Sequence, residues 1–358
     1  MSNKKKTVAR KRNTKKVAGP RGPKPAANVK KPHFVVCIGA SAGGLNALSE
    51  LVSQLPASIN AAVFVVLHLS KSAIGEILAH RIRQHTKLHC QIAGNNLPVL
   101  PGHIYIAPPD VHLLIEKRKM VLGHGPTENR FRPSIDVLFR SAAASCGERV
   151  IGIVLTGFLN DGTSGMWAIR QSGGYCIVQD PNEAEYPDMP LSVLETMEVG
   201  RVATLREMSG IILDIIKTKK IKGVVPPTDI VAESTLSAKA ATSLEQVRSL
   251  GEKTIYACPD CGGGLWKVKN GNIQRYRCHI GHSYTEKDLE LKQSEHIEQT
   301  LWIAVRMMEE RKLLLKKIAT ENKEKGLDKL SAFYLEQAAK LEIHIENMKE
   351  LLFAVNKD

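Results

Sequence analysis

Short apolar runs alternate with amphipathic segments along the first two-thirds of the chain. Four runs have the length and apolar content of buried strands: Phe34–Ala40, Ala62–Leu69, Val150–Thr156 and Gly174–Gln179. Segments with apolar residues at helical spacing predict helices at Gly43–Leu55, Ile74–Gln84, Ser134–Cys146, Thr163–Gln171, Leu191–Met197 and Arg206–Lys217. This alternation predicts an α/β fold, a doubly wound and mostly parallel sheet with helices on both faces.

One region departs from this alternation before the third predicted helix. His103–Ala107 and the alternating stretch Val111–Leu122 carry strand-like patterns, and the second contains the polar turn Glu116–Lys119. We expect these residues to form an inserted β-hairpin.

The remainder of the chain divides into parts of different character. The sheet-forming domain is expected to span 33–217, and the Lys-, Pro-, Ser- and Thr-containing stretch 218–253 is interpreted as a linker. A compact Cys/His module follows at 254–284. Residues 285–358 keep apolar positions three and four apart on both sides of Gly326, which predicts a helical hairpin or short coiled coil.

The net charge of +14 is concentrated at the start of the chain. Residues 1–32 contain twelve Lys and Arg and no acid, so the rest is close to neutral. With four prolines and few apolar residues, this basic tail is predicted to be disordered. It could contact nucleic acid, an anionic surface or an acidic partner, or simply be solvated.

Composition excludes several classes of protein. No apolar run approaches the roughly 20 residues that span a bilayer, so an integral membrane protein is not expected. The basic N-terminus lacks the apolar segment of a secretory signal. Seven scattered cysteines do not suggest a disulfide framework, and a cytoplasmic location is expected.

Three residues with the chemistry of a nucleophilic triad follow strand-like runs. Ser41 follows the run at 34–40, His68 follows the apolar residues 63–67, and Asp161 follows the run at 150–155. The carboxyl ends of parallel strands meet at one crevice, so these side chains are expected to converge. Ser, His and Asp together can perform acyl transfer, which predicts an esterase-like hydrolase.

Each member of this set also has a simpler explanation. Ser41 lies in a Gly-rich turn and could cap a helix or bind a phosphate, and Asp161 could form a turn or cap the next helix. Three such residues at equivalent positions favour the catalytic interpretation. Helix amides after Ser41 are suited to an oxyanion, so Ala42 and Gly43 are expected in the oxyanion pocket.

The Cys/His module has metal-ligand spacing. Cys258 and Cys261 form a C-x2-C pair, and Cys278 precedes His279 and His282. Thiolate and imidazole groups in two such knuckles suit tetrahedral Zn²⁺, and four protein ligands make the metal structural. We predict Cys258, Cys261, Cys278 and His282 as ligands, with His279 as the alternative fourth ligand.

Five ordered motifs resemble the catalytic domain of chemotaxis protein-glutamate methylesterases. The resemblance covers roughly residues 33–215 and rests on Ile38–Gly44, His68, Pro101–Pro109, Arg132–Phe139 and Thr156–Gly162. It implies that Ser41, His68 and Asp161 form the triad of a serine hydrolase. It further implies hydrolysis of glutamate γ-methyl esters on chemoreceptor-type proteins, with release of methanol and, in some members, deamidation of glutamine.

The sequence departs from that family at three places. A basic tail precedes the domain where the best-known members carry a phosphorylatable receiver domain, so control by aspartyl phosphate is not expected. Phe158 replaces the usual Met at a position that, with Gly157, the resemblance implies to lie in the oxyanion and substrate pocket. Leu69-Ser70-Lys71 replaces the usual Met-Pro. The Cys/His extension resembles one found in some relatives without a receiver domain, which implies that it binds a partner. The C-terminal helices could bind a signalling partner.

Two other functions remain open from the sequence. One is a non-catalytic signalling scaffold that works through its metal-binding and helical modules. The other is nucleic-acid binding through the basic tail and a zinc ribbon, with Trp266 or Tyr276 stacking on bases.

Overall fold

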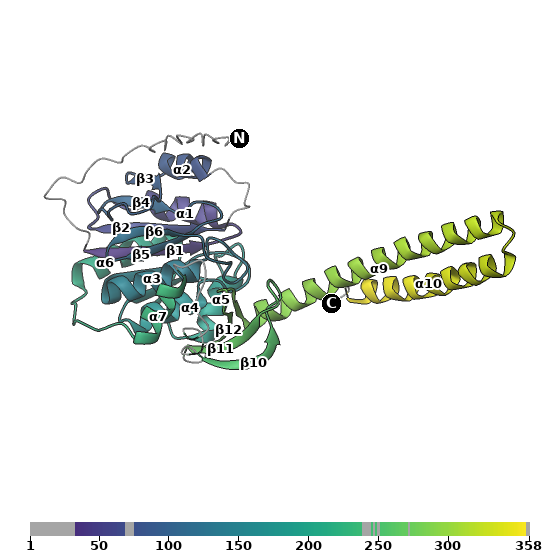
Figure 1. Ribbon diagram of the computed structural model, residues 1–358. Coiled ribbons are helices and arrows are strands. Elements are labelled where there is room, and N and C mark those ends of the chain that lie inside the picture. Colours follow the sequence, from purple (N-terminus) through teal and green to yellow (C-terminus); the bar gives the residue numbers. More distant parts are fainter. Residues whose placement is uncertain are drawn as a thin grey trace, which may run out of the picture. The chain divides into compact units, whose positions relative to one another are not determined.

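The computed structural model describes residues 33–68, 75–237, 245, 248, 251–270 and 273–355 (Figure 1). The predicted basic tail lies outside the described residues, as do residues 69–74 and most of 238–250.

Seven parallel strands form the main sheet (Figure 1). Their bounds are β1 Phe34–Ala40, β2 Ala61–Leu67, β3 His89–Ile92, β4 His103–Ile106, β7 Val150–Val154, β8 Tyr175–Gln179 and β9 Arg201–Ala203. The spatial order is β3-β4-β2-β1-β7-β8-β9, so the chain builds outwards from β1 in both directions. This order is doubly wound, as the apolar pattern predicts.

Helices cover both faces of the sheet because side chains alternate along each buried strand. Val36 and Ile38 of β1 pack in a core with α1 (Gly44–Ser53), α2 (Gly75–Gln84) and α6 (Leu205–Thr218). The neighbouring Val35 and Cys37 pack in the opposite core. Three helices and a hairpin cover that core: α3 (Ile135–Cys146), α4 (Thr163–Gln171), α5 (Asp188–Thr196) and the strands β5 (His112–Glu116) and β6 (Lys119–Gly123). The 3-10 turn η1 (Gly147–Arg149) leads into β7.

The structure corrects two parts of the expected organisation. His103–Ile106 belongs to the main sheet as β4, and only β5 and β6 form the inserted hairpin. The stretch interpreted as a linker contains helix α7 (Thr228–Ser237), whose Ile230 is buried in the core with α3. Because α7 also buries the polar Glu233 and Ser237, its sequence lacks a clear apolar stripe.

The C-terminal part forms a second sheet and a pair of helices. The sheet is antiparallel, with β10 Gly251–Ala257, β11 Gly264–Asn270, β12 Ile273–Cys278 and β13 Ser283–Thr285. Helix α9 (Glu286–Glu324) then turns at Gly326, which has φ 73°, into α10 (Asp328–Val355). Val305, Ile345 and Leu352 are buried between the two helices, which confirms the predicted helical pair.

None of the helices in the described ranges is long and apolar enough to cross a membrane.

Candidate functional site

The topology brings the three predicted catalytic residues to one edge of the main sheet. Ser41 directly follows β1, His68 directly follows β2, and Asp161 lies in the connection between β7 and α4. Strand β1 pairs with both β2 and β7 and is where the direction of sheet growth reverses. Ligands of open α/β sheets bind in the crevice at such a switch point.

His68 is hydrogen-bonded to Asp161 and lines the same hollow as Ser41. Nε2 of His68 is 2.9 Å from a carboxylate oxygen of Asp161. Within the described residues, the other ring nitrogen, Nδ1, is buried and has no hydrogen-bond partner. Ser41 and His68 both line a hollow of about 370 Å³. The arrangement leaves one imidazole nitrogen available to take a proton from a nucleophile.

Asp161 is buried in a cradle of donors. Its carboxylate accepts from Nδ2 of Asn129 at 2.9 Å and from the hydroxyl of Ser134 at 2.9 Å. The backbone amides of Ile135 and Asp136, in the first turn of α3, donate at 2.7 and 3.1 Å. Burial opposes ionisation, but the hydrogen bond and charge of His68, together with these donors, lower the pKa of Asp161. Asp161 is therefore an anion aimed at the imidazole.

Asp161 and Asp136 each accept hydrogen bonds from the first backbone amides of the other's neighbouring helix. Asp161 precedes α4 but accepts the first amides of α3, whereas Asp136 of α3 accepts the amides of Gly162 and Gly165 at the start of α4. Burial and the nearby Asp161 carboxylate raise the pKa of Asp136 to about 7. Ser134 occupies the N-cap position of α3, but its hydroxyl donates to Asp161 and does not cap the helix.

Thr156 fixes the turn that carries Ser41. Its carbonyl accepts the amide of Ser41 at 3.0 Å, and its hydroxyl donates to the carbonyl of Ala42 at 3.1 Å. Gly43 adopts φ 70°, which favours glycine, and α1 begins at the next residue. In the described part of the chain, no backbone hydrogen bond uses the amides of Ala42 or Gly43. These amides are suitable donors for an oxyanion.

Gly157 and Phe158 border the same region in different ways. The amide of Gly157 donates to the carbonyl of Tyr186 at 2.9 Å, so this residue offers space beside Ser41 and not an oxyanion donor. A Cβ at Gly157 would lie 2.6 Å from Cβ of Ser41. Phe158 is 49% exposed, with its ring centroid 4.3 Å from that of Tyr186. Its ring packs on Tyr186, and Phe158 is not among the residues that line the hollow with Ser41.

Sequence reasoning missed the residues that support the triad. Asn129 and Thr156 act through contacts with residues distant in the chain, and Phe131 stacks on His68 with ring centroids 3.6 Å apart. Only Ser134 gave a local signal, because an N-cap serine before an apolar helix is a recognisable pattern.

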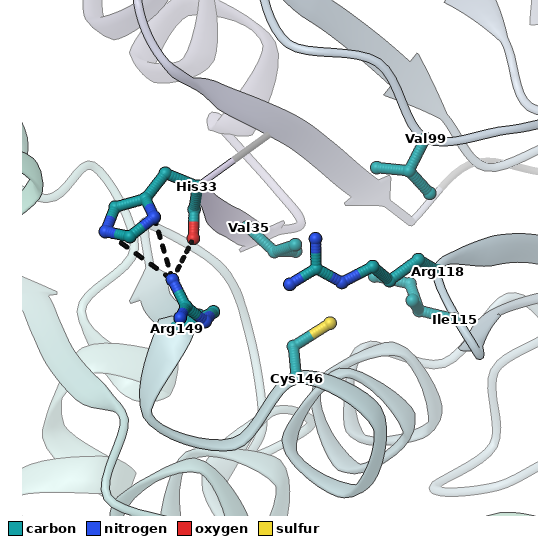
Figure 2. Close-up of a pocket in the computed structure, with 7 residues that line it drawn as sticks. All are labelled: His33, Val35, Val99, Ile115, Arg118, Cys146 and Arg149. Atoms are coloured by element: carbon teal, nitrogen blue, oxygen red, sulfur yellow. Dashed lines mark hydrogen bonds between the residues drawn. The ribbon is translucent and has the colours of Figure 1, made fainter. Parts of the chain in front are cut away.

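Figure 2 shows a second hollow, at the opposite end of β1. It is lined by His33 and Val35, and Arg149 donates to the ring of His33 at 2.8 Å. Ser41 lies six positions after Val35 in the chain, which is roughly 20 Å along an extended strand. The cavity measures about 10 Å³, so it holds about one water molecule and is not a substrate site.

The C-terminal sheet brings four of the predicted metal ligands together. Ligand atoms of Cys258, Cys261, Cys278 and His282 all lie within 4.8 Å of one another. Sγ of Cys258 and of Cys278 are 3.7 and 3.5 Å from Nδ1 of His282, and Sγ of Cys261 is 3.7 Å from that of Cys278. A zinc ion about 2.3 Å from sulfur and about 2.0 Å from nitrogen sets tetrahedral ligand atoms about 3.5–3.8 Å apart. The donor set therefore fits zinc.

The geometry also separates the two candidate histidines. Nδ1 of His282 belongs to the cluster, and His279 does not. The imidazole of His279 lies beside Gly263, outside the four ligand atoms. A hydrogen bond with the Cys278 thiol is the main cause that lowers the pKa of Cys258, which favours the thiolate form that zinc binds.

Comparison with known proteins places the catalytic part in a family. The sequence model described as CheB methylesterase matches residues 36–212. A protein-glutamate methylesterase/protein-glutamine glutaminase of Rhizobium johnstonii is 36% identical over 191 residues, which is 52% of each chain. A putative protein of the same name from Leptospira interrogans is 35% identical over 179 residues, covering 50% of this chain and 92% of the relative. The chain thus spans about half the length of the Rhizobium relative and nearly all of the Leptospira relative.

A solved structure agrees with the sequence matches. The catalytic domain of the Thermotoga maritima CheB methylesterase is 29% identical, with a TM-score of 0.50. It covers 52% of this chain and all of its own. The fold and the matched length agree, and the chain belongs to the CheB methylesterase family of hydrolases.

Proposed function

We propose that this protein hydrolyses glutamate γ-methyl esters on a chemoreceptor-type protein and releases methanol, and that it also deamidates glutamine at such sites. The observation that carries the proposal is the His68–Asp161 pair, whose buried Nδ1 has no partner among the described residues and whose ring lines the same hollow as Ser41. The names of the relatives supply the substrate class.

The reaction follows from the positions of these groups. Oγ of Ser41 attacks the ester carbonyl carbon while Nδ1 of His68 takes the hydroxyl proton, and the Asp161 carboxylate stabilises the imidazolium. The carbonyl oxygen becomes an oxyanion that the amides of Ala42 and Gly43 can bind. The bond to the methoxy group then breaks, and His68 returns the proton so that methanol leaves. Water attacks the acyl-enzyme by the same route and restores Ser41.

Glu185 gives the site a preference for neutral substrates. Its carboxylate lines the hollow, and a Cβ placed on Gly43 would lie 2.7 Å from one of its oxygens. A glutamate methyl ester or a glutamine side chain is uncharged, whereas the product is a glutamate carboxylate. Repulsion between the product and Glu185 assists release and disfavours binding of unmodified glutamate.

The metal cluster is proposed to hold a structural zinc ion. Cys258, Cys261, Cys278 and His282 would fill all four positions, which leaves none for a substrate. All seven cysteines are free of disulfides, and we propose a reducing, cytoplasmic location.

The test is methanol release from membranes that contain methylated chemoreceptors, with Ser41→Ala as the inactive variant. Ser49→Ala is the matched control, because Ser49 lies on α1 and its hydroxyl donates only to the carbonyl of Leu45. Release by the wild type and by Ser49→Ala, with none from Ser41→Ala, supports the proposal. Equal release from all three, or none from the folded wild type, refutes it.

A further inference from the structure

The loop between β6 and α3, residues 124–134, connects the catalytic carboxylate to the C-terminal sheet. Nδ2 of Asn129 donates to Asp161 at 2.9 Å, and the backbone amide of the same residue donates to the carbonyl of Ser283 at 2.8 Å. Asn129 is 1% exposed. One buried residue therefore joins Asp161 to the first residue of β13.

A cluster of buried charges holds this loop against β12. Glu128, which precedes Asn129, is 2.5 Å from Arg140 of α3 and 3.1 Å from Arg277 of β12. Glu233 of α7 is 2.6 Å from Arg275, also on β12. The side chains of these five residues are at most 2% exposed.

The balance of charge in this buried cluster requires the two arginines of β12. Among these five residues, the elements packed on the main sheet supply two carboxylates, Glu128 and Glu233, and one guanidinium, Arg140. Arg275 and Arg277 of β12 supply the other two cations. Without β12, two buried carboxylates would face one guanidinium, and an uncompensated buried charge is strongly destabilising. The loop that binds Asp161 therefore depends on β12 for its electrostatic balance.

The C-terminal sheet also holds the segment that carries Asp161. Nδ2 of Asn160 donates to the hydroxyl of Thr285 at 2.9 Å, and Arg275 donates to the hydroxyl of Ser164 at 3.0 Å. Asp161 lies between these two anchored positions in the chain. Contacts with β12 and β13 thus reach both the carboxylate's donors and its own backbone.

The predicted metal ligands lie next to these contact residues. Cys278 follows Arg277, and His282 precedes Ser283. The amide of Cys278 donates to the carbonyl of His282 at 3.0 Å, which closes the turn between β12 and β13. A metal bound at this turn would fix the spacing of the two strands that contact the catalytic domain.

We propose that β12 and β13 are a positioning element of the hydrolase, which keeps Asp161 at hydrogen-bond distance from His68 through Glu128, Asn129 and Asn160. In this proposal the metal site maintains the structure of β12 and β13. The inference rests on the proposed serine-hydrolase function. Arg277 and Ser283 act on the reaction only through other residues.

The first test measures how fast a fluorophosphonate probe labels Ser41, across a range of pH, in the full chain. Arg277→Met removes the guanidinium at similar length, and Arg277→Lys restores the charge. Arg306→Met removes a guanidinium from an exposed pair with Glu310 on α9 and is the matched control. We expect Arg277→Met to slow labelling by on the order of tenfold to a hundredfold, as for a small displacement of a catalytic group.

The shape of the pH profile distinguishes positioning from loss of folded protein. A misplaced Asp161 stabilises the imidazolium less, so the midpoint of the profile moves to lower pH in Arg277→Met and returns toward the wild-type value in Arg277→Lys. Partial unfolding lowers the amplitude at every pH and leaves the midpoint in place. An unchanged midpoint in Arg277→Met overturns the proposal.

The second test removes the metal from the wild-type chain with a chelator and follows amide hydrogen exchange in residues 124–134. We expect faster exchange in this loop together with slower labelling of Ser41, and recovery of both on adding Zn²⁺. Unchanged loop exchange after proven metal loss overturns the role of the metal. This test does not need Arg277→Met to fold. Because the probe reports on Ser41 without a methyl ester, failure to release methanol while labelling persists refutes the substrate and leaves the positioning role standing.

Discussion

The imidazole of His68 lies face to face with the ring of Phe131, with centroids 3.6 Å apart and planes within 8° of each other. Phe131 belongs to the same loop as Asn129, and its backbone is paired with that of Glu128 in both directions. The loop therefore supports the catalytic histidine from its ring face as well as through Asp161. A flat stack restricts rotation of the imidazole, and the proposed mechanism requires one nitrogen toward Asp161 and the other toward Ser41.

Replacing Phe131 with Leu removes the stacked surface and keeps an apolar side chain. We expect kcat for ester hydrolysis to fall by about tenfold, with a smaller change in KM, because the orientation of His68 is affected and not the binding of substrate. Steady-state kinetics check this. Phe333→Leu, on the exposed surface of α10, is the control and should leave both constants unchanged. A change in KM alone in Phe131→Leu would contradict the role of Phe131 in orienting His68.

Gly157→Ala should impair the nucleophile without unfolding the protein. The added Cβ would lie 2.6 Å from Cβ of Ser41 and would also press on Met189, so Ser41 must move. We expect labelling of Ser41 by a fluorophosphonate to slow by about tenfold or more. Gly210→Ala on α6 meets nothing within 4 Å and should raise helix stability by about 0.5–1 kcal/mol with normal labelling. Normal labelling of Gly157→Ala would show that this contact is not limiting.

Metal analysis distinguishes the two histidines of the C-terminal sheet. His282→Ala should lose bound zinc, because its Nδ1 is one of the four clustered ligand atoms. His279→Ala should keep the metal, because its imidazole lies outside the cluster. Zinc content of the purified variants, measured by elemental analysis, decides the matter. Retention of zinc by His282→Ala together with its loss from His279→Ala would reverse the assignment.

The buried charge cluster predicts how stability depends on pH. Burial opposes the charge on Glu233, but Arg140, Arg275 and Arg277 outweigh it and lower the pKa from 4.5 to about 2. A carboxyl whose pKa falls on folding stabilises the folded state above pH 4.5, and that contribution is lost as the pH drops toward 2. For Glu233 it amounts to about 3 kcal/mol at neutral pH.

Urea unfolding of the wild type and Glu233→Gln at several pH values measures this contribution. The two proteins should differ most at pH 7 and converge as the pH approaches 2, because the wild-type carboxyl is then protonated. Glu350→Gln, at an exposed position of α10, should follow the wild-type curve throughout. A difference between wild type and Glu233→Gln that stays constant with pH would contradict the pKa direction.

The central part of the fold was predictable because its strands are continuous apolar runs. β1, β2 and β7 are buried on both faces, and buried parallel strands need no alternation of polar residues. The edge strands β3 and β9 were missed, since they contain four and three residues and include exposed positions. Helix α7 was missed because part of its buried face is polar.

The convergence of Ser41, His68 and Asp161 was predictable for a related reason, and the contacts that hold Asp161 were not. Ser41 and His68 directly follow strands, so topology alone brings them together. Glu128 and Arg277 have no local pattern that marks them as buried, because charged residues are usually at the surface. Their pairing depends on contact between segments 149 positions apart in the sequence. Long-range ion pairs of this kind leave no periodic signal.

The contact between Asn129 and Ser283 also has a consequence for when activity appears during synthesis of the chain. Synthesis proceeds from the amino terminus, and early segments begin to fold while later ones are still being added. Ser41, His68 and Asp161 emerge from the ribosome well before β12 and β13. If the late strands complete the support of Asp161, a nascent chain cannot carry out efficient hydrolysis until its carboxyl-terminal sheet has emerged. The enzyme would then become active only after β12 and β13 have been synthesised.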